Sequence, residues 1–176
     1  SGTTITILSA GSCTIKADQA GNGNYNAASQ VSQAFTINKA NLTITSTTSS
    51  ASKVYGASDP TFSYTVSGLK NSESIASITN TFTGTGSYNS TSAPTNVGSY
   101  TLTPSDAVMS GSASINNYNV TYTAVSYSIT AADQTITFNT LSGKTYGDSP
   151  FTVSASATSG LTVTFSTSSS ACSVSG

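Results

Sequence analysis

Side chains that commonly carry out catalysis are scarce in this chain of 176 residues. It has no His, two Cys and five basic residues, all of them Lys. General acid–base catalysis at neutral pH and many metal sites rely on His, and glycoside hydrolysis needs two carboxylates facing each other across a cleft. The six acids are widely spread along the chain, at Asp18, Asp59, Glu73, Asp106, Asp133 and Asp148. We therefore expect no enzyme and no cofactor.

Hydroxyl groups, by contrast, are abundant, with 36 Ser and 31 Thr. Without His or a Gly-x-Ser-x-Gly elbow, these hydroxyls do not predict a nucleophile. The formal net charge of −1 and the five Lys exclude a basic surface for nucleic acid. No run of 18 apolar residues is present, so we expect no direct membrane insertion.

Three weaker signals concern a calcium site, an isopeptide bond and glycosylation. Asp18 with Asn22 and Asn24 has oxygens suited to calcium, but it lacks further carboxylates, and Gly21-Asn22-Gly23-Asn24 is more simply a turn. We predict no metal site. An intramolecular Lys–Asn isopeptide bond stays open, because the sequence does not place the partners. Asn-x-Ser/Thr motifs are expected by chance in so Ser/Thr-rich a chain, and they begin at Asn41, Asn89 and Asn119.

Alternating apolar and hydroxyl residues predict half-buried β-strands. This pattern occurs at residues 3–8, 41–45, 62–66, 99–103, 127–130, 135–138 and 161–165. No stretch has a sustained helical period, and the best candidate for a single helical turn is 72–78. A net charge near zero, together with 9 Tyr and 6 Phe, argues against disorder. We predict an all-β fold.

An internal repeat indicates two related domains. The run from Lys53 to Phe62 recurs in shortened form from Lys144 to Phe151, and both copies contain a Tyr-Gly pair followed by Pro. Glycine permits a positive φ and proline favours a turn. Tyr55-Gly56 and Tyr146-Gly147 are therefore predicted to be equivalent structural turns.

A second motif, which occurs at Val97-Gly98-Ser99-Tyr100 and at Asn22-Gly23-Asn24-Tyr25, places a tyrosine two residues after a glycine at the start of a predicted strand. In Val97-Gly98-Ser99-Tyr100 this spacing predicts a corner tyrosine, which is buried and donates its hydroxyl to upstream backbone. Gly98 and Tyr100 are thus predicted structural residues rather than a sugar-binding site.

Seven sequence features occur together in residues 41–130, namely Leu42-Thr43-Ile44, Tyr55-Gly56, Asp59-Pro60, Tyr64-Thr65-Val66-Ser67-Gly68, Val97-Gly98-Ser99-Tyr100, Asn117-Tyr118 and Ile129-Thr130. Through these features, residues 41–130 resemble the YGX-type MBG domain of large bacterial surface proteins. The acidic residue that usually follows the turn at Gly68 is displaced to Glu73. The resemblance implies an extracellular module at the cell surface, with no catalytic residues.

The flanking segments carry motifs of their own. Residues 133–176 contain Gln134-Thr135-Ile136-Thr137-Phe138, Lys144-Thr145-Tyr146-Gly147 and Cys172-Ser173-Val174. Residues 3–37 contain Thr4-Ile5-Thr6-Ile7-Leu8, the run Ala10–Ile15, the run Gln19–Asn22, Tyr25 and Phe35-Thr36-Ile37. Through these motifs, residues 133–176 resemble the first half, and residues 3–37 the second half, of a bacterial immunoglobulin-like (Big-type) repeat. The expected domains are a half module at 1–38, a complete sandwich at 39–131 and a half module at 132–176, arranged as elongated tandem immunoglobulin-like β-sandwiches.

These resemblances imply a structural repeat in an extracellular bacterial surface polymer, either an adhesin stalk or a filament. We expect a rigid spacer whose partners are adjacent copies of the same repeat, placed head to tail. The alternative is an adhesin module that binds surface carbohydrate through exposed tyrosines, for which the candidates are Tyr88, Tyr118 and Tyr122. Clustered exposed tyrosines would favour the adhesin, and scattered or buried ones the spacer.

The two cysteines, Cys13 and Cys172, fall in different halves of the same kind of module. Cysteines of an exported protein are expected to pair, but the whole sandwich at 39–131 separates these two. We therefore expect Cys172 of one copy to bond to Cys13 of the next. Ser175-Gly176 and Ser1-Gly2 also read as the same two residues counted twice, as in a head-to-tail array made either of one tandem polypeptide or of separate subunits.

Overall fold

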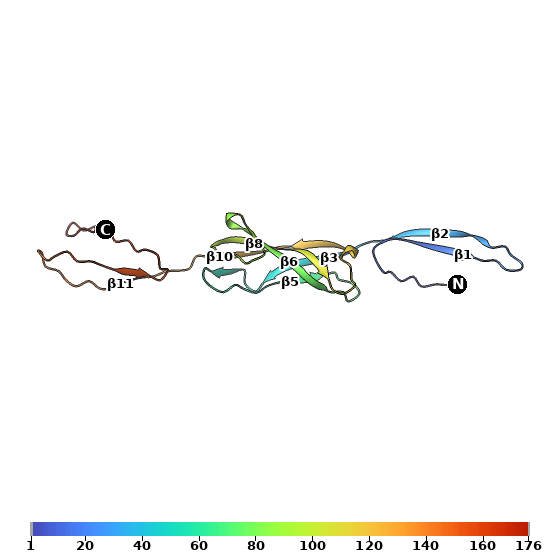
Figure 1. The fold of residues 1–176 in the computed structure, drawn as a ribbon, viewed down its shortest axis with the longest axis horizontal. Helices are drawn as coiled ribbons and strands as arrows, with labels where there is room; N and C mark the ends of the chain where they lie inside the picture. The colour runs from blue at the N-terminus through green and yellow to red at the C-terminus, as the bar shows by residue number, and fades with distance from the viewer. Residues whose placement is uncertain (1, 176) are drawn as a thin grey trace. The chain divides into compact units, whose positions relative to one another are not determined.

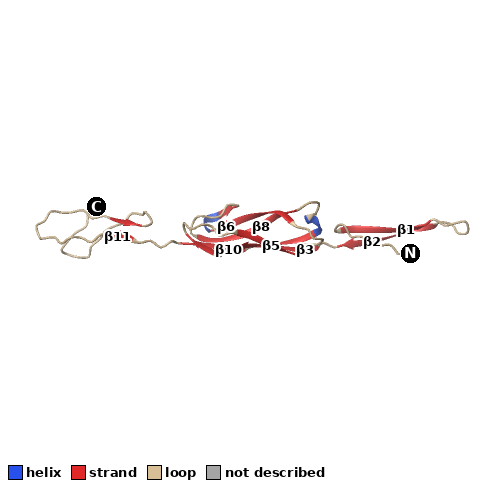
Figure 2. Ribbon diagram, turned by 90° about the horizontal axis from the view of Figure 1, so that it is seen from below, coloured by secondary structure: helices blue, strands red, loops and turns tan. Residues whose placement is uncertain are grey.

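The computed structural model describes residues 2–175, so the expected overlap of Ser1-Gly2 with Ser175-Gly176 lies partly outside the described residues. Twelve strands and two short 3-10 turns make up the regular structure of these residues (Figures 1 and 2). The predicted all-β fold is confirmed. The chain divides after Thr130 into two compact units.

Two sheets form a sandwich in the middle of the chain. The smaller sheet has the order β5-β3-β9, with β3 at Ala40–Thr48, β5 at Phe62–Ser67 and β9 at Tyr118–Thr123. The larger has the order β4-β10-β8-β6-β7, with β4 at Ser52–Val54, β6 at Ile75–Gly84, β7 at Tyr88–Ser90, β8 at Gly98–Met109 and β10 at Val125–Thr130. The 3-10 turns η1 (Thr85–Ser87) and η2 (Ile115–Asn117) precede β7 and β9.

The sandwich has a core of two clusters. One contains Leu42, Ile44, Ala107, Met109 and Tyr118, and the other contains Phe82, Tyr100, Leu102, Tyr127 and Ile129. In β3 and β10 the buried side chains alternate with less buried ones, as the period-2 pattern predicts. The Ser46 hydroxyl, also buried, donates to Asn80 Oδ1 at 3.0 Å and so links the two sheets.

The two strands that begin the sandwich, β3 and β4, pair in parallel with the two that end it, β9 and β10. β3 pairs with β9 from Ala40↔Tyr118 onward, and β4 pairs with β10 up to Val54↔Thr130. Because strands advance about 3.3 Å per residue, the run from Tyr118 to Thr130 spans about 40 Å. The chain therefore enters the sandwich at one end, at Ala40, and leaves at the other, at Thr130.

A bulge in β8 keeps one face of a long strand buried. Leu102 and Pro104 are buried, and after Asp106, which has a φ of 49°, the buried positions become Ala107 and Met109. The register against β6 shifts in the same stretch. A bulge reverses the alternation of a strand at one point, so β8 contributes to both core clusters.

Each terminal part contains one pair of strands. Strands β1 (Gly11–Gln19) and β2 (Ala28–Ile37) form an antiparallel hairpin, and β11 (Ile136–Phe138) pairs with β12 (Ala155–Ala157). The strands predicted at 3–8 and 161–165 are not formed, because no described residue supplies a pairing partner for them. The candidate helical turn at 72–78 is also wrong: Asn71 and Ser72 form a turn with positive φ, and β6 begins at Ile75.

Candidate functional site

The two Tyr-Gly turns have the same backbone geometry. In the first, the Ala57 amide donates to Val54 O at 3.0 Å and Gly56 has a φ of 82°. In the second, the Asp148 amide donates to Thr145 O at 3.0 Å and Gly147 has a φ of 99°. A positive φ at the third residue is typical of a type II turn. The tyrosine of each turn, Tyr55 or Tyr146, is exposed to solvent.

An ion pair spans the first of these turns. Lys53 Nζ lies 2.5 Å from Asp59 Oδ1, and the Lys53 side chain is largely covered. The hydrogen bond to Asp59 raises the pKa of Lys53 above its usual value. In the second copy, no described acid forms such a pair with Lys144; that ammonium group instead lies 5.0 Å from the ring centroid of Phe151.

Tyr100 has the geometry of a corner tyrosine. It is 4% exposed, and its hydroxyl donates to Asn96 O, four residues upstream, at 2.8 Å. Gly98 leaves room for the Thr85 side chain, since a Cβ at residue 98 would lie 2.5 Å from Thr85 Oγ1. Thr85 Oγ1 in turn accepts the Ser99 amide at 2.9 Å. Gly98 and Tyr100 therefore hold the start of β8 in place.

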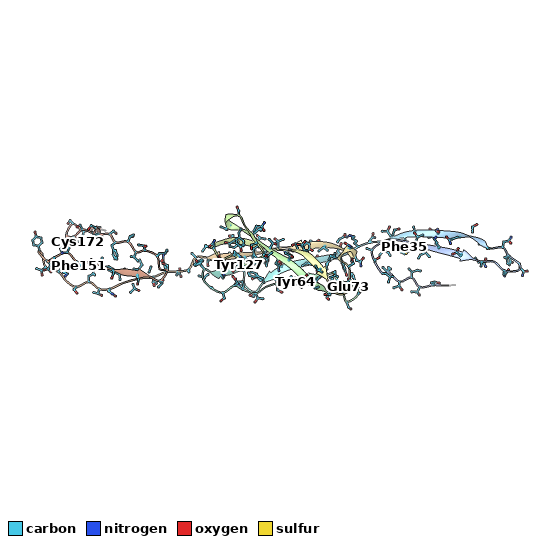
Figure 3. The ribbon with its side chains drawn as sticks, in the orientation of Figure 1. Phe35, Tyr64, Glu73, Tyr127, Phe151 and Cys172 are labelled. Atoms are coloured by element: carbon cyan, nitrogen blue, oxygen red, sulfur yellow. The ribbon has the colours of Figure 1, made fainter. Side chains whose placement is uncertain are left out.

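Tyr118, a candidate for carbohydrate binding, is in fact 4% exposed. Its hydroxyl donates to the Glu73 carboxylate and accepts the Lys70 amide at 2.9 Å. Burial raises the pKa of Tyr118, and the hydrogen bond to Glu73 raises it further. Through Tyr118, Glu73 and Lys70 thus attach the loop between β5 and β6 to β9; Glu73 is labelled in Figure 3.

The other two candidate tyrosines also form hydrogen bonds with backbone groups. The Tyr122 hydroxyl accepts the Ala107 amide at 2.9 Å, next to the bulge in β8. The Tyr88 hydroxyl donates to Ser92 O at 2.8 Å, and its ring packs edge-on against Tyr100 with centroids 5.6 Å apart. Neither side chain is fully exposed.

Three tyrosines are exposed, and each lies in a different turn. Tyr25 is in the hairpin loop between β1 and β2, Tyr55 is in the first Tyr-Gly turn and Tyr146 is in the second. Only Tyr55 belongs to the central sandwich. The exposed tyrosines are thus scattered along the chain.

The outer face of the larger sheet carries an open depression of about 440 Å³ over β8 and β10. Its rim includes the hydroxyl side chains Ser99, Thr101, Ser126 and Ser128, and no charged residue lines it. Such a surface offers hydrogen bonds but no charge and little aromatic area for stacking.

Two of the acidic residues accept hydrogen bonds from close neighbours in their own hairpin or turn. Asp18 accepts a hydrogen bond from Gln30 Nε2 at 2.8 Å, and Asp148 Oδ2 accepts the Thr145 amide at 2.9 Å. The Asn22 side chain accepts the amides of Asn24 and Tyr25, which makes this segment a turn. Within residues 2–175 no group of three or more His, Cys, Asp or Glu is placed to hold a metal ion.

Both cysteines are free thiols in this single chain. Cys13 is half-buried in β1, opposite Phe35, and Cys172 is exposed with its sulfur 3.5 Å from Thr167 Oγ1. Each lies in a part of the chain with many exposed apolar side chains, including Phe35 in the N-terminal part and Phe151 in the C-terminal part. Figure 3 labels Cys172, Phe35 and Phe151.

Two structural features of the site were not anticipated from the sequence. The role of Glu73 depends on a loop of unpredicted path, and Asn96 acts through its carbonyl group, which any residue could supply. Strand β1 could have been predicted, because Cys13, Ile15 and Ala17 alternate with polar residues.

Comparison with protein families gives a match to the central part of the chain. The family model of the MBG domain (YGX type) matches residues 42–128. This family is typical of bacterial surface proteins. No curated protein and no solved structure matches the chain. In the described residues, no helix has the length and apolar character needed to cross a membrane.

Proposed function

We propose that the chain is a structural spacer repeat of an extracellular bacterial surface polymer. The MBG family of residues 42–128 supports a repeat of a surface protein, and the geometry of the sandwich supports the spacer role. The partners of the chain are adjacent copies of the same repeat in a head-to-tail array.

The parallel pairing of the first and last strands is the observation that carries this proposal. A force along the chain acts at Ala40 and Thr130, at opposite ends of the sandwich. It loads the six residue pairs of β3 with β9 and the three pairs of β4 with β10 in shear. In shear these hydrogen bonds resist together, whereas pulling two paired ends apart breaks them one after another.

Single-molecule pulling on the full chain tests this role. Attachment at Asn41 and Thr130 shears the strands, and attachment at Asn41 and Asn119, which are direct partners in the β3–β9 ladder, unzips them. All three residues are exposed, and both native cysteines are replaced by Ser so that only the attachment thiols react. We expect a clearly higher unfolding force in shear. Equal or lower force would contradict the spacer role.

The adhesin alternative makes a different prediction. A glycan array probed with the full chain would give binding that disappears when Tyr25, Tyr55 and Tyr146 are replaced by Ala. The scattered exposed tyrosines and the hydrogen-bonded Tyr88, Tyr118 and Tyr122 favour the spacer. We expect no tyrosine-dependent binding.

A further inference from the structure

We infer that the N-terminal hairpin of one copy and the C-terminal unit of a second copy form one sandwich, closed by a disulfide between Cys13 and Cys172. This inference rests on the proposed function and specifies the contact through which adjacent copies join. It is carried by the faces of the two terminal parts and by the topology of the central sandwich.

The hairpin has one apolar and one polar face. In its register Cys13 lies opposite Phe35, Ile15 opposite Gln33 and Ala17 opposite Val31. Directly paired residues of an antiparallel ladder point to the same side, so these six residues share a face, and Gln33 is the one polar side chain among them. The residues between them are mostly hydrophilic and occupy the other face, at Ser12, Thr14, Lys16, Ser32 and Thr36.

Nothing in the described part of this chain covers the apolar face. Phe35 is 42% exposed and Val31 57% exposed, and no residue from 2 to 39 is buried. An isolated two-stranded hairpin is at best marginally stable in water. The hairpin therefore needs a second apolar layer.

The C-terminal unit also has apolar side chains that are exposed to solvent. Apolar side chains alternate along two of its segments, at Val153, Ala155, Ala157, Leu161, Val163 and Phe165. Phe138 packs against Phe165 with ring centroids 5.5 Å apart, yet Phe138 is 48% exposed. No residue from 131 to 175 is buried. This unit is one layer of a domain that requires two.

The positions of the cysteines indicate that a second copy of the chain covers the exposed apolar side chains. Cys13 belongs to the apolar face of the hairpin, and Cys172 alternates with Val174 in the C-terminal unit. Each unpartnered part thus has one thiol at an apolar position. A lipid surface would account for the exposed apolar residues but not for a thiol in each part.

The topology favours a contact between copies over one within a chain. The hairpin joins the sandwich at Ala40 and the C-terminal unit joins it at Thr130, at opposite ends of strands that span about 40 Å. A second copy placed end to end brings its C-terminal unit to the Ala40 end of the first. Because the two contact surfaces differ, the contact is heterologous and continues into an open array.

Formation of the bond requires an oxidant. Each thiol loses its proton, the two sulfurs together lose two electrons, and one S–S bond forms. A small-molecule disulfide such as oxidised glutathione accepts the two electrons and the two protons and is cleaved into two thiols. Copies along one polypeptide and separate chains would form the same bond.

The test compares the full chain with Cys13→Ser and Cys172→Ser in the presence of oxidised glutathione. On non-reducing gels we expect the unmodified chain to form a ladder of multimers that dithiothreitol collapses. Either variant alone should remain monomeric. An equimolar mixture of the two variants should stop at a dimer, with the peptides of Cys13 and Cys172 linked in the mass spectrum.

A second arm uses two copies of the chain joined in one polypeptide. We expect two of its four cysteines to resist a thiol reagent, namely Cys172 of the first copy and Cys13 of the second. A bond in this chain without multimers of separate chains supports the same contact between copies along one polypeptide. The inference is overturned if the two cysteines link within a monomer, if Cys13 pairs with Cys13, or if neither arm gives the bond.

These outcomes are independent of the pulling experiment. A low shear force would refute the spacer role while leaving the linked peptides in place. Absence of the disulfide would refute the joint while leaving the mechanical resistance of the central sandwich unchanged.

Discussion

Two buried tyrosines of the central sandwich differ in whether their hydroxyl has a partner. Tyr100 donates to Asn96 O, whereas the Tyr127 hydroxyl is buried without a hydrogen bond, among the rings of Phe62 and Phe82. Burial raises the pKa of Tyr127 because its ionised form is poorly solvated there. An unpaired buried hydroxyl costs free energy, while a paired one stabilises the fold.

We expect opposite effects of the same substitution at these two sites. Tyr100→Phe should lower the free energy of unfolding by about 1 kcal/mol, and Tyr127→Phe should raise it by about 1 kcal/mol or leave it unchanged. Urea denaturation followed by circular dichroism measures both. Because the chemical change is identical, each variant is the control for the other, and an equal loss at both sites would contradict the assignment.

Burial of Tyr118, together with its hydrogen bond to Glu73, makes the stability of the fold depend on pH in the alkaline range. The pKa of Tyr118 is raised in the folded state, so above about pH 10, where an unfolded tyrosine ionises, the folded chain retains a proton that the unfolded chain has lost. Stability therefore falls as the pH rises from the unfolded to the folded pKa. Tyr127 contributes in the same direction.

Replacing both tyrosines separates their contributions. Tyr118→Phe should lower stability at pH 8, because Glu73 and the Lys70 amide lose their partner, but it should also make the decline between pH 9 and 11 shallower. Tyr127→Phe should make that decline shallower without the loss at pH 8. Urea midpoints across this range provide the measurement, and an unchanged decline in both variants would rule out the raised pKa values as its cause.

At the scale of elements, Gly68 controls how β5 meets β3. Its φ is 101°, and a Cβ there would lie 2.2 Å from Asn41 O. Gly68→Ala should therefore destabilise the sandwich by about 2–4 kcal/mol, through backbone strain together with a clash. Gly111→Ala is the matched control, since Gly111 also has a positive φ, 64°, but open space around it. Similar losses of stability for the two variants in thermal denaturation would show that the clash at residue 68 is relieved at no cost.

Most strands of the sandwich could be predicted because their core positions alternate. Residues 41–45, 62–66, 99–103 and 127–130 all lie in observed strands. The same pattern failed at 3–8 and 161–165, because alternation reports a side chain's tendency to be buried on one face, whereas a strand also requires a neighbour to pair with. The bulge at Asp106 was missed because it interrupts the alternation within a single strand.

The site was less predictable than the fold. The turn at Gly56 and the buried position of Tyr100 follow from local spacing. The burial of Tyr118 does not, since it depends on Lys70 and Glu73, which are 48 and 45 residues away in sequence. Contacts of this kind are set by how sheets pack, which a single sequence does not reveal.

At the scale of the whole molecule, burial is confined to the central sandwich. Every buried hydrophobic residue of the described chain lies between Leu42 and Ile129. Ordering a residue costs about 1–2 kcal/mol in backbone entropy, and a full burial of a large apolar side chain returns about 1.5–3 kcal/mol. The terminal parts incur this entropic cost but gain little free energy from burial, so in one isolated copy they should open readily.

Hydrogen exchange of the full chain should therefore reveal two levels of protection. In the reduced monomer we expect slow exchange in β3, β8 and β10, and fast exchange in β1, β2, β11 and β12, because local opening needs little free energy where no core exists. When copies are joined by oxidation, protection should appear at β1–β2 and β11–β12 together, while the central strands stay unchanged. Cys13→Ser under the same oxidising conditions is the control and should remain unprotected at both. Protection of both terminal parts in the reduced monomer would mean that one chain completes its own second sandwich, and protection of only one part would mean that a different surface covers it.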